Sequence, residues 1–209
     1  MWNIPNILTL LRIAMIPVFV VIFYLPVPWA RPVCAAVFTA AALTDWLDGW
    51  LARRLGQTSP LGAFLDPVAD KLMVAIALVL LVQSDPRIAL ALPAAVIIGR
   101  EITVSALREW MAEVGARAQV AVSMAGKLKT TAQMIAIVLL ILHAPVLGIP
   151  VRPIGLVLIY VAAALTLWSM LIYMRAAWPS LTAPHTPKVA GTSHRDPAGR
   201  TDVADRVRK

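Results

Sequence analysis

Two neighbouring stretches carry most of the chemistry of this chain: DWLDGWLAR at positions 45–53 and GAFLDPVAD at positions 62–70. Together they hold four aspartates within 26 residues, Asp45, Asp48, Asp66 and Asp70. The aspartates are three positions apart in the first stretch and four apart in the second, so each pair projects from one face of a helix. The intervening residues 56–62, GQTSPLG, have the composition of a turn. Two antiparallel helices would therefore bring the two pairs of carboxylates face to face.

The four carboxylates need a compensating charge, because an ionised acid in or near lipid costs several kcal/mol unless it is paired or metal-bound. Ligands that are all oxygen suit Mg²⁺ or Mn²⁺ rather than Zn²⁺. Two such ions are well suited to bind a pyrophosphate and to stabilise an in-line displacement at phosphorus. The alternative is that the acids form salt bridges with Arg53, Arg54 and Lys71 at the membrane surface. Gly49 and Ala52 favour the metal interpretation, since they leave room beside the carboxylates.

The composition around these stretches is that of a membrane protein. Of the 209 residues 60% are apolar and 14% are charged, and the mean hydropathy is +0.79. Soluble domains have about 45–50% apolar residues and about 25% charged residues. Cys34 is the only cysteine and we expect it to be a packing residue. We predict an all-α polytopic fold, with one domain at 1–178 and six apolar runs long enough to cross a bilayer. The runs are 8–27, 33–53, 68–84, 88–108, 122–144 and 153–175.

The basic residues predict the orientation of these spans. Short turns follow the odd-numbered spans and hold three of the 19 Lys and Arg residues, Arg31, Arg87 and Arg152. The opposite side holds the other sixteen, six of them in the polar segment 179–209. The positive-inside rule then places both termini in the cytoplasm, with 179–209 as a disordered tail. The same rule accounts for the net charge of +8 without nucleic acid binding, and we interpret the first run as a retained span rather than a signal peptide.

The two stretches also resemble the signature of the CDP-alcohol phosphotransferase family. All eight signature positions are filled: Asp45, Asp48, Gly49, Ala52, Arg53, Gly62, Asp66 and Asp70. The resemblance implies that the four aspartates bind two divalent metal ions and that Asp70 is the general base. It also implies that Asp48, Gly49, Ala52, Arg53 and Gly62 line the site of the CDP-activated lipid.

Other segments resemble the branch of the family whose acceptor is glycerol 3-phosphate. They are 3–12, 69–75, 99–113 and 126–134. An acceptor phosphate needs cations beside the metal site, and four lie at the cytoplasmic ends of spans four and five: Arg100, Arg108, Lys127 and Lys129. The alternatives are snorkelling side chains and, for Arg100, a pair with Glu101 or with a signature aspartate. In the first segment Asn6, Thr9 and Arg12 either cap and anchor the helix or contact the donor phosphates.

The resemblance implies an enzyme that transfers a phosphatidyl group from CDP-diacylglycerol to glycerol 3-phosphate. We expect it in the bacterial inner membrane, as a homodimer, with an active site that faces the cytoplasm. One alternative is a related enzyme whose acceptor is serine, inositol phosphate or phosphatidylglycerol. Another is a cation-coupled transporter, but a transporter needs acids near the bilayer midplane, and these cluster at one end of the spans.

Overall fold

The computed structural model describes residues 4–55, 60–113 and 124–182. Some side chains within these ranges also lie outside the described part, and those of Asp48 and Asp66 are among them.

Six helices make up the described chain, which confirms the predicted all-α class. They are α1 (Ile4–Phe23), α2 (Ala30–Leu55), α3 (Pro60–Ser84), α4 (Ile88–Glu113), α5 (Met124–Leu142) and α6 (Val151–Thr182). Helix α1 ends at Phe23, before the predicted limit at 27, because Pro26 and Pro28 cannot continue a helix. Helix α6 continues to Thr182, so residues 179–182 are helical where the sequence predicted the start of the tail.

Three described segments are long and apolar enough to cross a membrane: Pro67–Ser84, Ile88–Met111 and Val151–Arg175. Two shorter apolar helical segments, Ile7–Phe23 and Lys129–Leu142, accompany them. Length and composition thus support a membrane protein, through segments that the sequence predicted as spans one and three to six.

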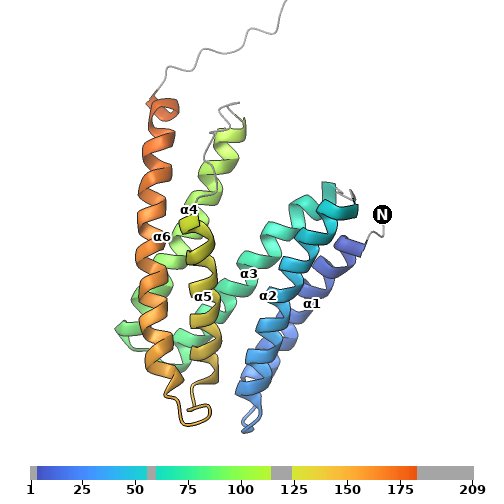
Figure 1. Ribbon diagram of the computed structural model, residues 1–209, viewed down its shortest axis with the longest axis vertical. Helices are drawn as coiled ribbons and strands as arrows, with labels where there is room; N and C mark the ends of the chain where they lie inside the picture. The colour runs from blue at the N-terminus through green and yellow to red at the C-terminus, as the bar shows by residue number, and fades with distance from the viewer. Residues whose placement is uncertain (1–3, 56–59, 114–123, 183–209) are drawn as a thin grey trace, which may run out of the picture.

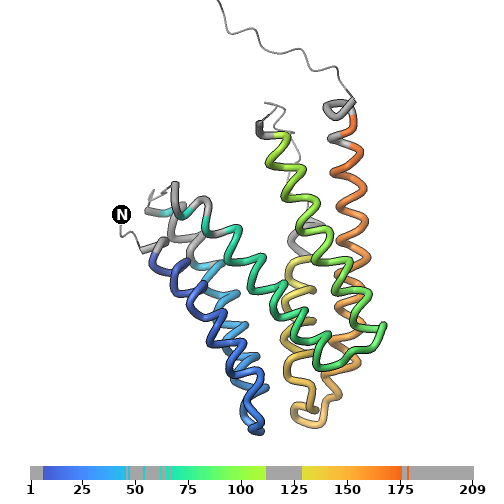
Figure 2. Tube along the Cα trace, turned by 180° about the vertical axis from the view of Figure 1, so that it is seen from behind, coloured from blue at the N-terminus to red at the C-terminus, as the bar shows by residue number. Residues whose placement is uncertain are grey.

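The helices form two groups that α3 connects (Figure 1). Helix α1 packs along α2, and α5 packs along α6 with α4 beside it. Helix α3 runs obliquely from the first group to the second, as the view from behind also shows (Figure 2). The start of α1, the end of α2 and the start of α3 lie toward the upper end of Figure 1, where α4 and α6 also end. The helix ends that the sequence assigned to one side of the membrane therefore lie at the same end of the bundle.

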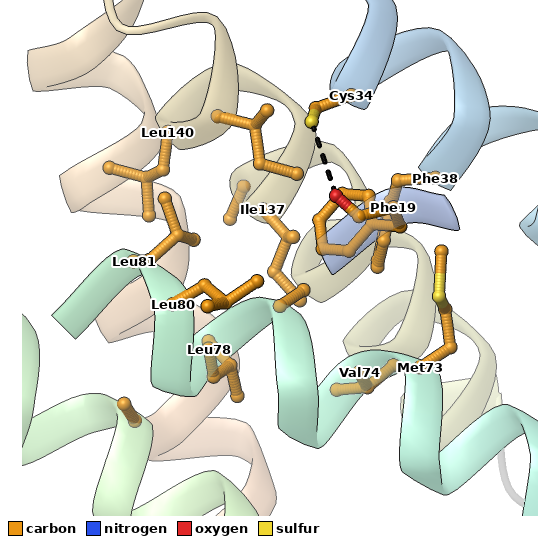
Figure 3. Close-up of a cluster of buried hydrophobic side chains, with 14 of the residues drawn as sticks. Phe19, Cys34, Phe38, Met73, Val74, Leu78, Leu80, Leu81, Ile137 and Leu140 are labelled. Atoms are coloured by element: carbon orange, nitrogen blue, oxygen red, sulfur yellow. Dashed lines mark hydrogen bonds between the residues drawn. The ribbon is translucent and has the colours of Figure 1, made fainter. Parts of the chain in front are cut away.

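An apolar core holds the two groups together in the middle of the bundle (Figure 3). Phe19 of α1 lies against Phe38 of α2, with ring centroids 6.3 Å apart. Leu78 of α3 and Ile137 of α5 are fully buried in the same cluster. Cys34 is buried there as a free thiol, and its sulfur lies 3.7 Å from the carbonyl oxygen of Phe19, which agrees with its predicted packing role.

Candidate active site

A buried arginine holds the first aspartate of the signature. The Nη1 of Arg12, on α1, donates to the Oδ1 of Asp45, on α2, at 2.8 Å. The Arg12 side chain is 1% exposed and that of Asp45 is 44% exposed. The pair therefore has one desolvated partner and one that reaches solvent. The sequence suggested Arg53, Arg54 and Lys71 as salt-bridge partners of the acids, but the partner of Asp45 is Arg12.

Asp70 connects this pair to a larger polar cavity. Asp70 and Arg12 line a small cavity together, and Phe38 and Met134 are also on its walls. Asp70 lines a second cavity of about 400 Å³, which lies between α3, α4, α5 and α6. Asp45 and Arg12 are close enough to act electrostatically on the Asp70 carboxylate. The two signature aspartates with described side chains thus lie in one region, at the junction of the two helix groups.

The remaining two aspartates belong to the same helices. Asp48 lies about one turn along α2 from Asp45, and Asp66 about one turn before Asp70 on α3. Their side chains are outside the described residues, and among the side chains that are described no group of three or more metal-binding residues occurs. The four-carboxylate site therefore stays a prediction.

The larger cavity has a basic wall that is built around Glu101 of α4. The Oε1 of Glu101 accepts from Arg100 Nη1 at 2.9 Å and from Lys129 Nζ, on α5, at 2.8 Å. The pair of Arg100 with Glu101 that the sequence left open is therefore present. One carboxylate between two cations leaves this group of three with a net positive charge, and all three residues line the cavity.

Helix α6 supplies two polar side chains that orient the arginines of α4. Arg100 Nη2 donates to the Oγ of Ser169 at 2.9 Å. Arg108 Nη2 donates to the hydroxyl of Tyr173 at 2.8 Å, and its guanidinium carbon lies 5.1 Å from the centre of the Tyr173 ring. Sequence reasoning missed both α6 residues. Their spacing of four positions within an apolar helix was the available signal, since it places both on one face.

Two further residues shape the walls of the cavity. The Nζ of Lys71, next to Asp70 on α3, donates to the Oγ of Ser105 on α4 and so ties these two helices together. Gln133 lies about one turn after Lys129 on α5, is buried and also lines the cavity. Sequence reasoning singled out neither Ser105 nor Gln133.

The other predicted site residues fall into two sets: some have described side chains, and the side chains of the rest lie outside the described part of the structure. Thr9 is fully buried about one turn before Arg12, and Gly62 is buried near the start of α3. Three of the four predicted acceptor cations, Arg100, Arg108 and Lys129, line one cavity with Asp70. The predicted residues whose side chains lie outside the described part are Asn6, Asp48, Gly49, Ala52, Arg53, Asp66 and Lys127.

Comparison with known proteins supports the family resemblance that the sequence signature indicated. A sequence model of the family described as CDP-alcohol phosphatidyltransferase matches residues 2–168. The chain is 57% identical over 180 residues to the CDP-diacylglycerol–glycerol-3-phosphate 3-phosphatidyltransferase of Pseudomonas fluorescens, a match that covers 86% of this chain and 92% of the relative. Proteins of the same name from Pectobacterium atrosepticum and Yersinia enterocolitica are 55% and 57% identical, over 88% and 87% of this chain and 99% and 98% of theirs.

Proposed function

Because the chain belongs to the CDP-alcohol phosphatidyltransferase family, we propose that it transfers a phosphatidyl group from CDP-diacylglycerol to sn-glycerol 3-phosphate. The products are phosphatidylglycerophosphate and CMP. The names of the relatives supply the donor and the acceptor, and the chain covers nearly the whole length of these relatives.

One observation supports this acceptor most directly: a signature aspartate and three cations line the same cavity. Asp70 lies on the α3 wall, while Arg100, Arg108 and Lys129 come from α4 and α5. An acceptor with a hydroxyl at one end and a phosphate at the other matches this arrangement. Serine has no phosphate: its carboxylate carries one negative charge, and its ammonium group would be repelled by these cations.

The donor set of the signature fits divalent metal ions. Asp45 uses Oδ1 for Arg12, and since both carboxylate oxygens carry lone pairs, Oδ2 remains suitable as a metal ligand. We assign two ions, Mg²⁺ or Mn²⁺, to Asp45, Asp48, Asp66 and Asp70. Bound there, the ions would neutralise the pyrophosphate of the donor and the charge that develops during transfer.

The acidic and basic side chains of the cavity have distinct tasks in this proposal. Asp70 accepts the proton of the acceptor 1-hydroxyl, and the resulting oxygen attacks the β-phosphorus, the one bonded to the diacylglycerol oxygen. The bond from this phosphorus to the oxygen of CMP breaks, and CMP leaves. The acceptor phosphate is assigned to Arg100, Arg108, Lys127 and Lys129, because guanidinium and ammonium groups form strong charge-assisted hydrogen bonds with phosphate.

The donor lipid is assigned to the region between α2 and α3. Thr9 and Gly62 are buried near this region, and Gly49 and Ala52 keep the adjacent turn of α2 small. The proposed set of donor contacts is Asn6, Thr9, Asp48, Gly49, Ala52, Arg53 and Gly62.

The same proposal places the protein in the bacterial inner membrane. Domain 1–178 would cross it six times, with both termini, the tail and the active site on the cytoplasmic side, and two copies would form a homodimer. The support for the orientation is the shared end of the bundle on which the basic helix ends and the signature lie.

An acceptor screen tests the proposed reaction. Protein purified in detergent is given CDP-diacylglycerol and Mg²⁺ with glycerol 3-phosphate, serine, inositol phosphate or phosphatidylglycerol, and CMP release is measured. We expect release with glycerol 3-phosphate and background release with the other three. Release with another acceptor in its place would identify a related transferase, and no release with any acceptor would contradict the enzymatic function.

A further inference from the structure

Gln133 is a buried amide in the wall of the active-site cavity, and its oxygen has no hydrogen-bond partner among the described residues. The residue is 5% exposed and lines the cavity of about 400 Å³. Its Oε1 is buried, and within the described part of the chain no donor reaches it. Buried polar side chains nearly always have partners, because an unsatisfied one is costly. The terminal torsion of a glutamine side chain is broad, so the amide can rotate and present Oε1 to a partner that arrives in the cavity with the substrate.

The position of Gln133 along α5 places it between the two ends of the proposed acceptor site. Lys129, four positions earlier on the same helix face, belongs to the basic wall. Met134, the next residue, lines both the main cavity and the small cavity that contains Arg12, and Asp70 lines both as well. The wall formed by α5 therefore leads from the phosphate-binding cations, past Gln133, toward the aspartate.

The acceptor has one polar group that the proposed mechanism does not use. Glycerol 3-phosphate carries its phosphate on C3, the attacking hydroxyl on C1 and a secondary hydroxyl on C2. With the phosphate at Lys129 and the C1 hydroxyl at Asp70, the C2 hydroxyl comes between them. An amide can accept a hydrogen bond from this hydroxyl through Oε1 and donate one to it through Nε2.

We propose that Gln133 is a specificity-determining residue that binds the C2 hydroxyl of the acceptor. The proposal rests on the reaction proposed above. It also predicts selectivity between the two enantiomers, because C2 is the stereocentre of glycerol 3-phosphate. When the phosphate and the C1 hydroxyl are both held in place, sn-glycerol 1-phosphate directs its C2 hydroxyl away from the position that the sn-3 enantiomer occupies.

A double comparison of residue and acceptor tests the proposal. The residue change is Gln133→Met, which keeps the length of the side chain and removes its hydrogen-bonding amide. The acceptor change is 3-hydroxypropyl phosphate, which has the phosphate and the attacking hydroxyl but no C2 hydroxyl. The value of kcat/KM is measured by CMP release for both proteins with both acceptors, with CDP-diacylglycerol and Mg²⁺ at saturation.

We expect unaltered protein to prefer glycerol 3-phosphate over 3-hydroxypropyl phosphate by at least about 10-fold, as for the loss of one hydrogen bond in a buried site. Gln133→Met should lose this preference by slowing the reaction of glycerol 3-phosphate alone. Its activity with 3-hydroxypropyl phosphate should stay within about 3-fold of the unaltered protein, a smaller change than the loss of about 10-fold expected with glycerol 3-phosphate. Retained activity with this acceptor also shows that the variant is folded. The matched control is Gln83→Met at the far end of α3, where the Gln83 Oε1 accepts from the hydroxyl of Tyr24, and it should keep the full preference.

Equal losses with both acceptors would overturn the proposal, because they would show a structural role for Gln133. An unchanged preference in the variant would overturn it too. If Gln133→Met cannot be purified, Gln133→Asn replaces it: the shorter amide withdraws from the hydroxyl and the same loss of preference is expected. Failure of the proposed function would look different, since unaltered protein would then release no CMP with glycerol 3-phosphate.

Discussion

The guanidinium of Arg12 is almost fully buried and donates to the Oδ1 of Asp45 at 2.8 Å, so α1 holds the first aspartate of the signature on α2. A buried cation is costly without a partner, and Asp45 provides the opposite charge. In return, Arg12 restricts the orientation of a carboxylate that we assign to a metal site. Arg12 is therefore a positioning residue, and its effect on activity would pass through the orientation of Asp45 and through its charge near Asp70.

Replacement of Arg12 should reduce both stability and activity. For Arg12→Met we expect a loss of about 1–2 kcal/mol, less than for a fully buried pair, because the remaining Asp45 carboxylate reaches solvent. CMP release should fall by at least about 10-fold, the effect of about 1.4 kcal/mol on a barrier. Thermal unfolding in detergent and CMP release measure the two effects.

The matched control for Arg12 is Arg87→Met. Arg87 pairs with Asp85 at 2.6 Å at the opposite end of the bundle, and its side chain is largely exposed, so the loss should stay below about 1 kcal/mol. Equal effects of the two substitutions on stability and activity would show that the Arg12–Asp45 pair has no special role.

Replacement of Asp70 should stop turnover. Asp70→Asn keeps the shape of the side chain but cannot accept the proton of the acceptor hydroxyl, and general-base catalysis contributes about 10²–10⁴-fold. We expect kcat to fall by that factor at saturating Mg²⁺ and saturating substrates. Asp85→Asn, just beyond the far end of α3, serves as the control and should leave kcat nearly unchanged. Normal turnover in Asp70→Asn with metal present would refute the assignment of the base.

Replacement of Lys129 should weaken the binding of the acceptor more than the binding of the donor. Lys129 is 4% exposed and its Nζ is held by Glu101, so the lost charge is in place before the acceptor binds. A charge-assisted hydrogen bond is worth about 1.5–3 kcal/mol, so Lys129→Met should raise KM for glycerol 3-phosphate by about 10-fold to 100-fold. The KM for CDP-diacylglycerol should change by much less than this. A similar rise in both KM values would argue against an acceptor site at the basic wall.

Gly155 should be essential to the packing of α6 on α5. A Cβ at this position would lie 3.0 Å from Leu140 Cγ and 3.3 Å from the carbonyl oxygen of Ala136. Gly155→Leu should therefore force the helices apart and cost about 1–3 kcal/mol, as overpacking does. Gly99→Leu on α4 is the control, because a Cβ there would meet none of the described atoms of the structure within 4 Å. Thermal unfolding compares the two variants, and equal midpoints would contradict this description of the α5–α6 contact.

Local patterns in the sequence were sufficient to predict the helices and the basic wall. Apolar run length predicted where the helices lie, and the alternation of successive spans predicted which of their ends lie together. The predicted end of the first helix was too late, because apolar residues continue past Phe23 although the prolines stop the helix.

Contacts between distant segments were beyond such patterns. Arg12 and Asp45 are 33 positions apart, and Arg108 and Tyr173 are 65 apart. These pairs depend on how α1 packs on α2 and α6 on α4, which no periodicity within one helix determines. The unsatisfied oxygen of Gln133 is a property of the packed cavity, so the sequence alone gives no sign of it.

The position of bound metal tests the central claim most directly. Crystals of the protein grown with Mn²⁺ and a CDP-alcohol lipid would show the ions by anomalous scattering. We predict two peaks between α2 and α3, each within about 2.0–2.6 Å of carboxylate oxygens from Asp45, Asp48, Asp66 and Asp70, the range of hard-cation ligation. The absence of any peak at these aspartates, with the four carboxylates pointing apart or paired with arginines, would contradict the two-metal site.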